Sequence, residues 1–102
     1  MDSIRFQWDE TKNLSNRRKH GVSFEEACQV FLDPLCVSAQ DRIEDGELRW
    51  QTLGLVEGVL PLTVAHTVRE ELADGTWVEV IRIISARPAT RKERRRYEDE
   101  NG

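Results

Sequence analysis

The chain is 102 residues long, with 38% hydrophobic and 33% charged residues and a formal net charge of −4. This length predicts one domain over residues 1–102, and apolar residues that cluster into periodic runs exclude a disordered chain. No apolar run approaches the roughly 20 residues that span a bilayer, and the N-terminus lacks a secretory signal. We therefore expect a cytoplasmic protein with no membrane partner. Its acidic balance argues against indiscriminate nucleic-acid binding.

The N-terminal segment predicts a strand followed by a polar helix. Residues 4–8 alternate apolar and polar side chains, which is the period of a half-buried strand. Asp9 is a good N-cap, and Gly21 supplies the left-handed conformation that ends many helices. The cations at residues 17–20 lie in the last turn, where the helix dipole favours them. Their presence therefore has a structural explanation and requires no function.

A second helix follows directly after this glycine. Ser23 and Glu26 have the spacing of a capping box, and apolar residues then recur at helical intervals. Asp33-Pro34 ends the helix, because the residue before a proline avoids the α region. The two helices should form a hairpin with a tight turn at the glycine.

The rest of the chain predicts strands separated by polar turns, and a final helix. In order we expect a short strand at 35–38, an acidic loop at 40–46, a strand at 47–56, a turn at 57–58, a strand at 59–68, a polar turn at 69–75 and a strand at 77–85. Pro88 should open the final helix at its first turn. The last strand is the most apolar and should lie centrally in the sheet. The fold class is α+β, a small antiparallel β-meander with helices against one face.

The last strand leads into the most basic segment of the chain. From Arg82 to Arg96 there are seven basic residues and a single acidic one, Glu93. Such a concentration of cations attracts phosphate, although a solvated basic helix is the simpler explanation. Arg82 is in phase with Val78 and Val80 and needs an anion or a carboxylate, with Glu47 as a possible partner. Arg87 should share the opposite face with Ser85. At the start of the final helix it could hold a phosphate.

Two other groups of polar residues are candidates for chemistry. Glu47 and Arg49 point to one side of their strand, either as a surface ion pair or as functional groups. His66 shares a face with apolar neighbours, which favours a core-edge histidine, but its position near a strand end favours substrate contact. Arg69 follows at the exit of the same strand.

Common hydrolase and metal motifs are missing from the sequence. There is no Gly-x-Ser-x-Gly, no phosphate-binding loop, no His-Glu-x-x-His and no carboxylate cluster suited to magnesium. Cys28 and Cys36 lack the neighbours that would complete a zinc site, so we interpret both as small core residues. An enzyme built from this chain should need no cofactor. Its arginines, histidines and carboxylates suit phosphodiester cleavage by a ribose 2′-hydroxyl.

A series of motifs is spread over the whole chain: Phe6-x-Trp8-Asp9-x-x-Lys12, Asn16, Lys19-His20-Gly21-Val22-Ser23-Phe24-Glu25-Glu26-Ala27, Val30-Phe31-x-Asp33-Pro34, Glu47-x-Arg49, Gly54, His66-Thr67-x-Arg69, Arg82-Ile83-Ile84-Ser85-Ala86-Arg87 and Glu93-Arg94-Arg95-x-Tyr97-Glu98. In this order they resemble the BrnT family of toxins. The resemblance implies the toxin of a type II toxin–antitoxin pair, with a RelE-like ribonuclease fold and RNA cleavage that slows translation. It also implies a hetero-oligomer with a small DNA-binding antitoxin that neutralises the toxin.

The resemblance further implies which residues act. The expected catalytic residues are Lys19, His20, Glu47, Arg49, His66, Arg69 and Arg87, and the expected substrate-binding residues are Arg82 and Arg91. Glu47 or His20 would be the base and Lys19 or His66 the acid, while arginines stabilise the phosphate. Replacing Arg49 or Arg87 with alanine should abolish growth arrest without unfolding the protein. The alternative is a non-catalytic module that only holds an antitoxin and tunes its grip on DNA.

Overall fold

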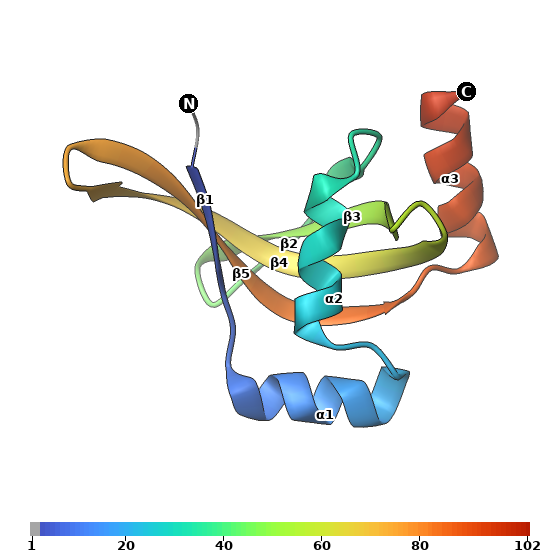
Figure 1. Cartoon of the computed structure of the whole chain (residues 1–102), viewed down its shortest axis with the longest axis horizontal. Helices are drawn as coiled ribbons and strands as arrows, with labels where there is room; N and C mark the ends of the chain where they lie inside the picture. Colours follow the sequence, from blue (N-terminus) through green and yellow to red (C-terminus); the bar gives the residue numbers. More distant parts are fainter. Residues whose placement is uncertain (1–2) are drawn as a thin grey trace.

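The computed structural model describes residues 3–102 as three α-helices, a short 3-10 helix and one five-stranded sheet (Figure 1). In chain order the elements are β1 (Ser3–Gln7), α1 (Glu10–His20), α2 (Phe24–Cys28), the 3-10 helix η1 (Gln29–Leu32), β2 (Val37–Glu44), β3 (Glu47–Val56), β4 (Leu60–Ala73), β5 (Thr76–Pro88) and α3 (Arg91–Asn101). The strand order is β1-β5-β4-β3-β2. The predicted α+β class and the antiparallel meander are confirmed. β1 adds a parallel strand beside β5, so the sheet is mixed.

The helix boundaries follow the capping residues that the sequence indicated. The Asp9 carboxylate accepts hydrogen bonds from the backbone at the start of α1, and Gly21 ends the helix with a φ of 73°. Ser23 and Glu26 form both bonds of the capping box at α2. The second predicted helix is divided, because its last turn tightens into η1 before Asp33.

Two segments that were predicted as loops are strands. β2 continues to Glu44, and β4 continues to Ala73, so the expected acidic loop at 40–46 and the polar turn at 69–75 were wrong. The reason is that each hairpin closes in a two-residue Asp-Gly turn with positive φ at both residues: 51° and 78° at Asp45-Gly46, and 51° and 76° at Asp74-Gly75. Polar side chains up to these turns lie on paired strands.

The end of the chain also differs from the prediction. Pro88 is the last residue of β5 and does not open α3. Thr90 is the N-cap instead, and it forms a capping box with Glu93. α3 stands at one end of the sheet (Figure 1), where the Tyr97 hydroxyl donates a 2.7 Å hydrogen bond to Asp33. The helix therefore docks on its own domain, although none of its residues is buried.

A β-bulge in β5 changes which residues share a face. Ala65 pairs with Ser85 and His66 pairs with Ile83, so Ile84 is an extra residue on β5. Strict alternation would put Arg82 and Arg87 on opposite faces, as the sequence analysis expected. The bulge shifts the phase by one residue, so both arginines lie on the same face. The predicted face of Ser85 and Arg87 was therefore wrong.

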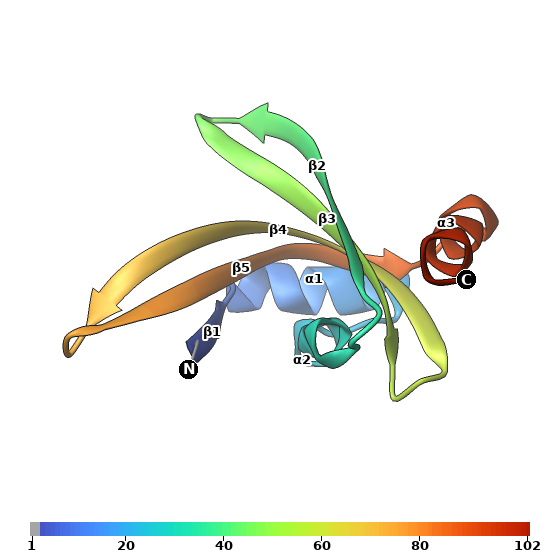
Figure 2. The ribbon, with the colours of Figure 1, turned by 90° about the horizontal axis from the view of Figure 1, so that it is seen from above.

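The two faces of the sheet have different coverings (Figure 2). α2 packs against one face, which we call the helix-covered face, and the core lies between them. The core residues are Val22, Phe24, Ala27, Val30, Val56, Leu62, Val64, Ile81, Ile83 and Ala86. Gly54 permits close packing here, because a Cβ atom at this position would lie 2.8 Å from the Val30 side chain. The opposite face carries no helix over its middle, and we call it the open face.

The β2–β3 and β4–β5 hairpins diverge toward their Asp-Gly turns. Pairing between β3 and β4 ends at Trp50 and His66, while each hairpin continues to its own turn. Seen from above, the two hairpins splay apart and the β2–β3 hairpin rises on the side away from α1 and α2 (Figure 2). Within residues 3–102, no helix has the length and apolar character needed to cross a membrane.

Candidate active site

Three arginines from three adjacent strands lie on the open face, and we call them the central arginine cluster: Arg49, Arg69 and Arg82. Arg82 on β5 pairs in register with Thr67 on β4, and Arg69 is two residues farther along the same strand. Arg49 on β3 lies one residue beyond the last β3–β4 pair, Trp50 and His66. Residues with these registers point to the same side of the sheet.

Arg82 reaches across β4 to a carboxylate on β3. Its Nη2 atom lies 2.5 Å from Oε1 of Glu47. Glu47 was predicted from the sequence as a possible partner of Arg82, and that prediction is confirmed. The two side chains are 37% and 48% exposed, so solvent screens their attraction and the pair is weak.

Arg69 belongs to a chain of ion pairs that extends to β1. Its Nε atom donates a 2.8 Å hydrogen bond to Glu71, and its Nη2 atom donates a 3.1 Å hydrogen bond to Gln7. Glu71 also pairs with Arg5. Hydrogen bonds from Arg69 and Arg5 lower the pKa of Glu71. A single carboxylate thus serves two guanidinium groups.

Arg49 has the least satisfied guanidinium of the cluster. Its side chain is only 18% exposed, and the nearest carboxylate oxygen, on Glu44, is 3.7 Å from Nη1. The Nε atom of Arg49 is buried and has no hydrogen-bond partner among the described residues. A buried donor without a partner carries a desolvation penalty of about 1–3 kcal/mol. An anion that reached this donor would remove that penalty.

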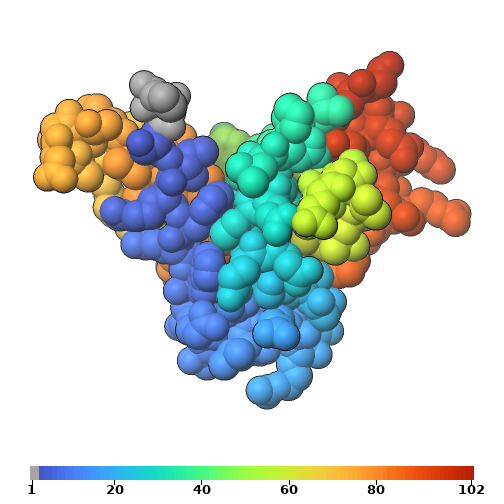
Figure 3. Space-filling view, viewed as in Figure 1, coloured from blue at the N-terminus to red at the C-terminus, as the bar shows by residue number. Residues whose placement is uncertain are grey.

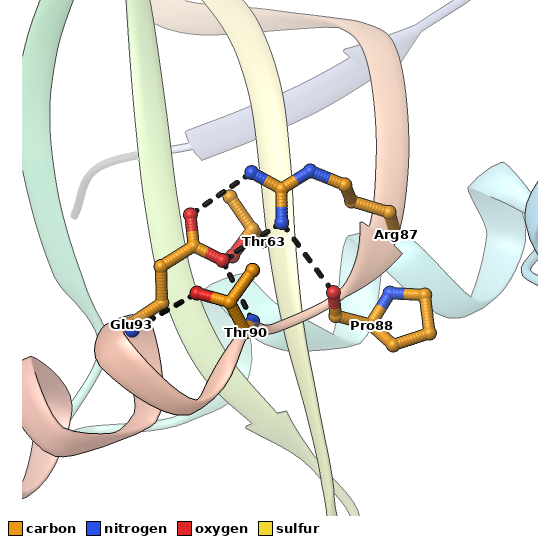
Figure 4. Close-up of polar contacts among 5 residues, drawn as sticks. All are labelled: Thr63, Arg87, Pro88, Thr90 and Glu93. Atoms are coloured by element: carbon orange, nitrogen blue, oxygen red, sulfur yellow. Dashed lines mark hydrogen bonds and ion pairs between the residues drawn. The ribbon is translucent and has the colours of Figure 1, made fainter.

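Arg87 lies on the same face but in a different environment (Figure 4). Its Nη1 and Nη2 atoms donate to the two carboxylate oxygens of Glu93, at 2.7 and 2.9 Å. Oε1 of Glu93 also accepts from the Thr63 hydroxyl and the Thr90 amide. The bidentate bond from Arg87 is the main reason that the pKa of Glu93 falls to about 2. The guanidinium of Arg87 is therefore already occupied.

Arg87 and the central arginine cluster are separate along the sheet. Arg87 pairs in register with Thr63, whereas Arg82 pairs with Thr67. Four residues along a strand correspond to roughly 13 Å. The open face thus holds two groups of predicted site residues and not one pocket. Arg91 adds an exposed cation at the first turn of α3, near Arg87 in the chain.

His66 lies on the other side of the sheet. It shares the helix-covered face with Leu62 and Val64, as its phase predicted, and it is 3% exposed. Its ring packs edge-on against Phe31 at 4.9 Å, and its Nε2 atom is 2.7 Å from the Thr52 hydroxyl. Burial lowers the pKa of His66. The structure does not bring this histidine to the arginines.

Lys19 and His20 end α1 at the edge of β5. The Asn16 side chain, one turn earlier, bonds both backbone groups of Ala86 in place of a further strand, at 2.8 and 3.2 Å. Lys19 is exposed and His20 is half-buried. Neither forms a side-chain hydrogen bond or ion pair within residues 3–102. They therefore lie toward the Arg87 end of β5 and not beside the central arginine cluster.

Sequence reasoning missed the roles of Glu93, Thr63 and Asn16. Glu93 was noted as the single acid in a basic run and as part of a family motif, but it was given no structural role. Thr90 and Glu93 have capping-box spacing that would have placed the carboxylate at the start of α3. No comparable signal marks Thr63, because its contact depends on the register of β4 and β5. The hydrogen bonds of Asn16 with Ala86 join residues 70 positions apart, so no local pattern in the sequence indicates them.

The fold and this face define a small α+β domain that presents several guanidinium groups on one uncovered sheet face, which is an arrangement suited to anionic substrates. The structure is similar to the 1.1 Å crystal structure of the Brucella abortus ribonuclease toxin BrnT, with a TM-score of 0.54 and 24% sequence identity. The match covers 89% of this chain and 99% of that one, and it supports the shared fold. No curated protein matches the chain.

The family model for BrnT, described as the ribonuclease toxin of a type II toxin–antitoxin system, matches residues 8–93. The chain therefore belongs to the BrnT family. Membership also implies an antitoxin protein as its partner.

Proposed function

We propose that the chain is an endoribonuclease that cleaves RNA without a metal ion, and that the central arginine cluster holds the scissile phosphate. Membership of a ribonuclease toxin family supports RNA as the substrate. Guanidinium groups bind phosphate oxygens and stabilise the charge that builds on them during cleavage. The site of chemistry would then be the middle of the open face.

The observation that carries this proposal is the unsatisfied guanidinium of Arg49. Its Nε donor is buried and unpartnered in the described residues, and its carboxylate neighbour is 3.7 Å away. Ion pairs as exposed as Arg82–Glu47 contribute only about 0–1 kcal/mol, so a phosphate can replace the carboxylate at little cost. The cluster can therefore accept an anion more easily than Arg87, which is bound bidentately.

The geometry supports Glu47 as the base of the reaction. Its carboxylate lies beside Arg82 on the same face as Arg49. In the proposed step Glu47 takes the proton of the ribose 2′-hydroxyl, whose oxygen attacks the phosphorus. The bond from phosphorus to the 5′-oxygen breaks, leaving a 2′,3′-cyclic phosphate. Arg49, Arg69 and Arg82 stabilise the phosphoryl oxygens.

Neither predicted acid, Lys19 or His66, lies beside the central arginine cluster, so in the proposed step solvent water protonates the leaving 5′-oxygen. His66 is buried on the opposite face, so we leave it out of the proposed site. Lys19 and His20 lie toward the Arg87 end of β5 and away from the central arginine cluster, so we leave both out of the proton transfer. Arg91 would bind the RNA backbone farther along the face, while Arg87 would hold Glu93 and the start of α3.

The test is a cleavage assay on a defined RNA in the presence of EDTA. We expect wild-type protein to release products with a 2′,3′-cyclic phosphate and a 5′-hydroxyl. Glu47→Gln should slow cleavage with little change in RNA affinity, because it removes a base but no cation. Cleavage that EDTA abolishes and magnesium restores would contradict metal independence.

The same assay separates the enzyme from the non-catalytic module. Protein that holds an antitoxin but leaves the RNA intact would favour the module. We further propose that the toxin acts in the cytoplasm, slows translation and is neutralised by a small DNA-binding antitoxin, and that its fold is RelE-like. These points rest on the family resemblance. Expression in cells with and without the antitoxin tests the site of action, the effect on translation and the neutralisation.

A further inference from the structure

An apolar surface lies on the helix-covered face, beyond the end of the helices. We call it the hairpin patch, and its residues come from β1 and the distal half of the β4–β5 hairpin: Ile4, Val68, Glu70, Leu72, Trp77 and Glu79. Its four apolar side chains are exposed: Ile4 by 50%, Val68 by 40%, Leu72 by 61% and Trp77 by 62%. The hairpin extends past the helices at one side of the molecule (Figure 3).

The register shows that these residues share one face. Leu72 pairs with Trp77, and Val68 pairs with Ile81, which is itself a core residue. Ile4 pairs with Glu79 across the parallel β1–β5 ladder. Because alternate residues of a strand point to the same side, the hairpin patch continues the core face where no helix covers it. Exposed apolar side chains gathered on one sheet face are a feature of interaction sites.

Two carboxylates in the middle of the hairpin patch define the charge of its partner. Glu70 and Glu79 are register partners on β4 and β5. Directly opposed side chains have Cβ atoms about 5 Å apart, and like charges there are destabilising. No lysine or arginine of residues 3–102 forms an ion pair with either carboxylate. A single cation brought between them would satisfy both.

We propose that the hairpin patch docks an amphipathic segment of a partner protein. Apolar side chains of that segment would pack on Trp77 and Leu72, and a lysine or arginine of the segment would pair with the two carboxylates. RNA is disfavoured as an occupant, because its phosphates would meet Glu70 and Glu79. A second copy of the chain is also disfavoured, since a two-fold contact would place the same carboxylates against each other. The antitoxin that family membership implies is the partner to which this surface is suited.

The docking surface is independent of the proposed ribonuclease site. The hairpin patch lies on the helix-covered face, whereas the central arginine cluster lies on the open face. A partner bound to the hairpin patch would leave the arginines uncovered unless it also reached around the sheet. Failure of one proposal therefore leaves the other testable.

The probe is a pair of synthetic amphipathic helical peptides that share one leucine pattern, with lysine at the polar positions of one and glutamate in the other. Isotope-labelled full-length protein is titrated with each and followed by NMR. We expect the lysine peptide to shift the Trp77 indole signal and the amides of residues 68–79. The glutamate peptide should leave them unchanged.

Charge reversal in the protein supplies the decisive comparison. The double variant Glu70→Lys, Glu79→Lys should bind the lysine peptide with an affinity at least about tenfold lower, and it should bind the glutamate peptide, which the wild type does not. The matched control is Glu98→Lys with Asp99→Lys on α3, which changes the net charge equally at two exposed residues. It should bind the lysine peptide like wild type. Cleavage of RNA should be unchanged in the hairpin variant.

Three results would overturn the proposal. The first is equal binding of both peptides, or no binding. The second is signal changes centred on α3 instead of the hairpin. The third is a concentration-dependent dimer, seen by sedimentation and broken by Leu72→Ser, which would make a second copy the occupant. Melting curves for each variant show whether lost binding reflects lost folding.

Discussion

Arg49 and Arg87 lie on the same face of one sheet, yet their surroundings differ. Arg87 has a carboxylate that matches its two Nη groups, and that carboxylate is itself held by Thr63 and the first turn of α3. Arg49 has a carboxylate at 3.7 Å and a buried Nε without a partner in the described chain. The guanidinium of Arg49 therefore has more unused hydrogen-bonding capacity than that of Arg87. We therefore expect Arg49 to bind the phosphate of the proposed reaction and Arg87 to act mainly on stability.

The largest effect that tests this contrast is expected at Arg49. Arg49→Ala should reduce RNA cleavage by about 100-fold or more, because in the proposed reaction this guanidinium stabilises the phosphoryl oxygens. The melting temperature should change little, since the ion pair it removes is loose. Arg42→Ala is the matched control, because it removes a cation bonded to the same Glu44 but 66% exposed. Equal loss in both variants would mean that bulk charge, and not Arg49, drives cleavage.

Arg87→Ala should act on stability more than on chemistry. It leaves Glu93, which is 20% exposed, without its main partner, and we expect a loss of about 1–2 kcal/mol after allowing for solvent screening. Urea unfolding measures the loss. Arg96→Ala, which removes an exposed pair with Glu100, should change stability by only about 0.5 kcal/mol. If Arg87→Ala abolishes cleavage at unchanged stability, the contrast with Arg49 is wrong.

The pH dependence of stability sharpens the account of Arg87. The pKa of Glu93 is about 2 in the folded protein, against an ordinary value of 4.5. Because the folded pKa is depressed, the contribution to stability is present above pH 4.5 and is lost as the pH falls from 4.5 toward 2. Glu93→Gln should flatten this part of the unfolding curve. An unchanged slope would show that other carboxylates govern acid unfolding.

Local signals explain how much of this fold could be predicted. Asp9, Gly21, Ser23 and Glu26 act on their own helix ends, so their roles were readable from the sequence. The Asp45-Gly46 turn carries the same signal as Asp74-Gly75 but was taken for part of a loop, which shortened β2. In that hairpin the error was one of interpretation and not of missing information.

Long-range features of the site could be predicted only in part. Alternation placed Glu47 and Arg49 on one face and made Glu47 a partner for Arg82, as the structure shows. The bulge at Ile84 is a property of pairing between β4 and β5, so no local pattern marked it and the face of Arg87 was assigned wrongly. Because the face of Arg87 was wrong, its bidentate contact with Glu93 was not predicted.

The smallest expected effect on cleavage is at His66, on the helix-covered face. His66→Gln should leave RNA cleavage unchanged, because His66 is buried beneath Phe31 on the helix-covered face. Burial lowers its pKa below the ordinary value of 6.5, so the unfolded chain binds the proton more readily. Wild-type stability should therefore decline as the pH falls below about 6.5, and the variant should lose that dependence. Loss of cleavage in a variant that folds normally would place the chemistry on both faces, and the open face alone could no longer account for it.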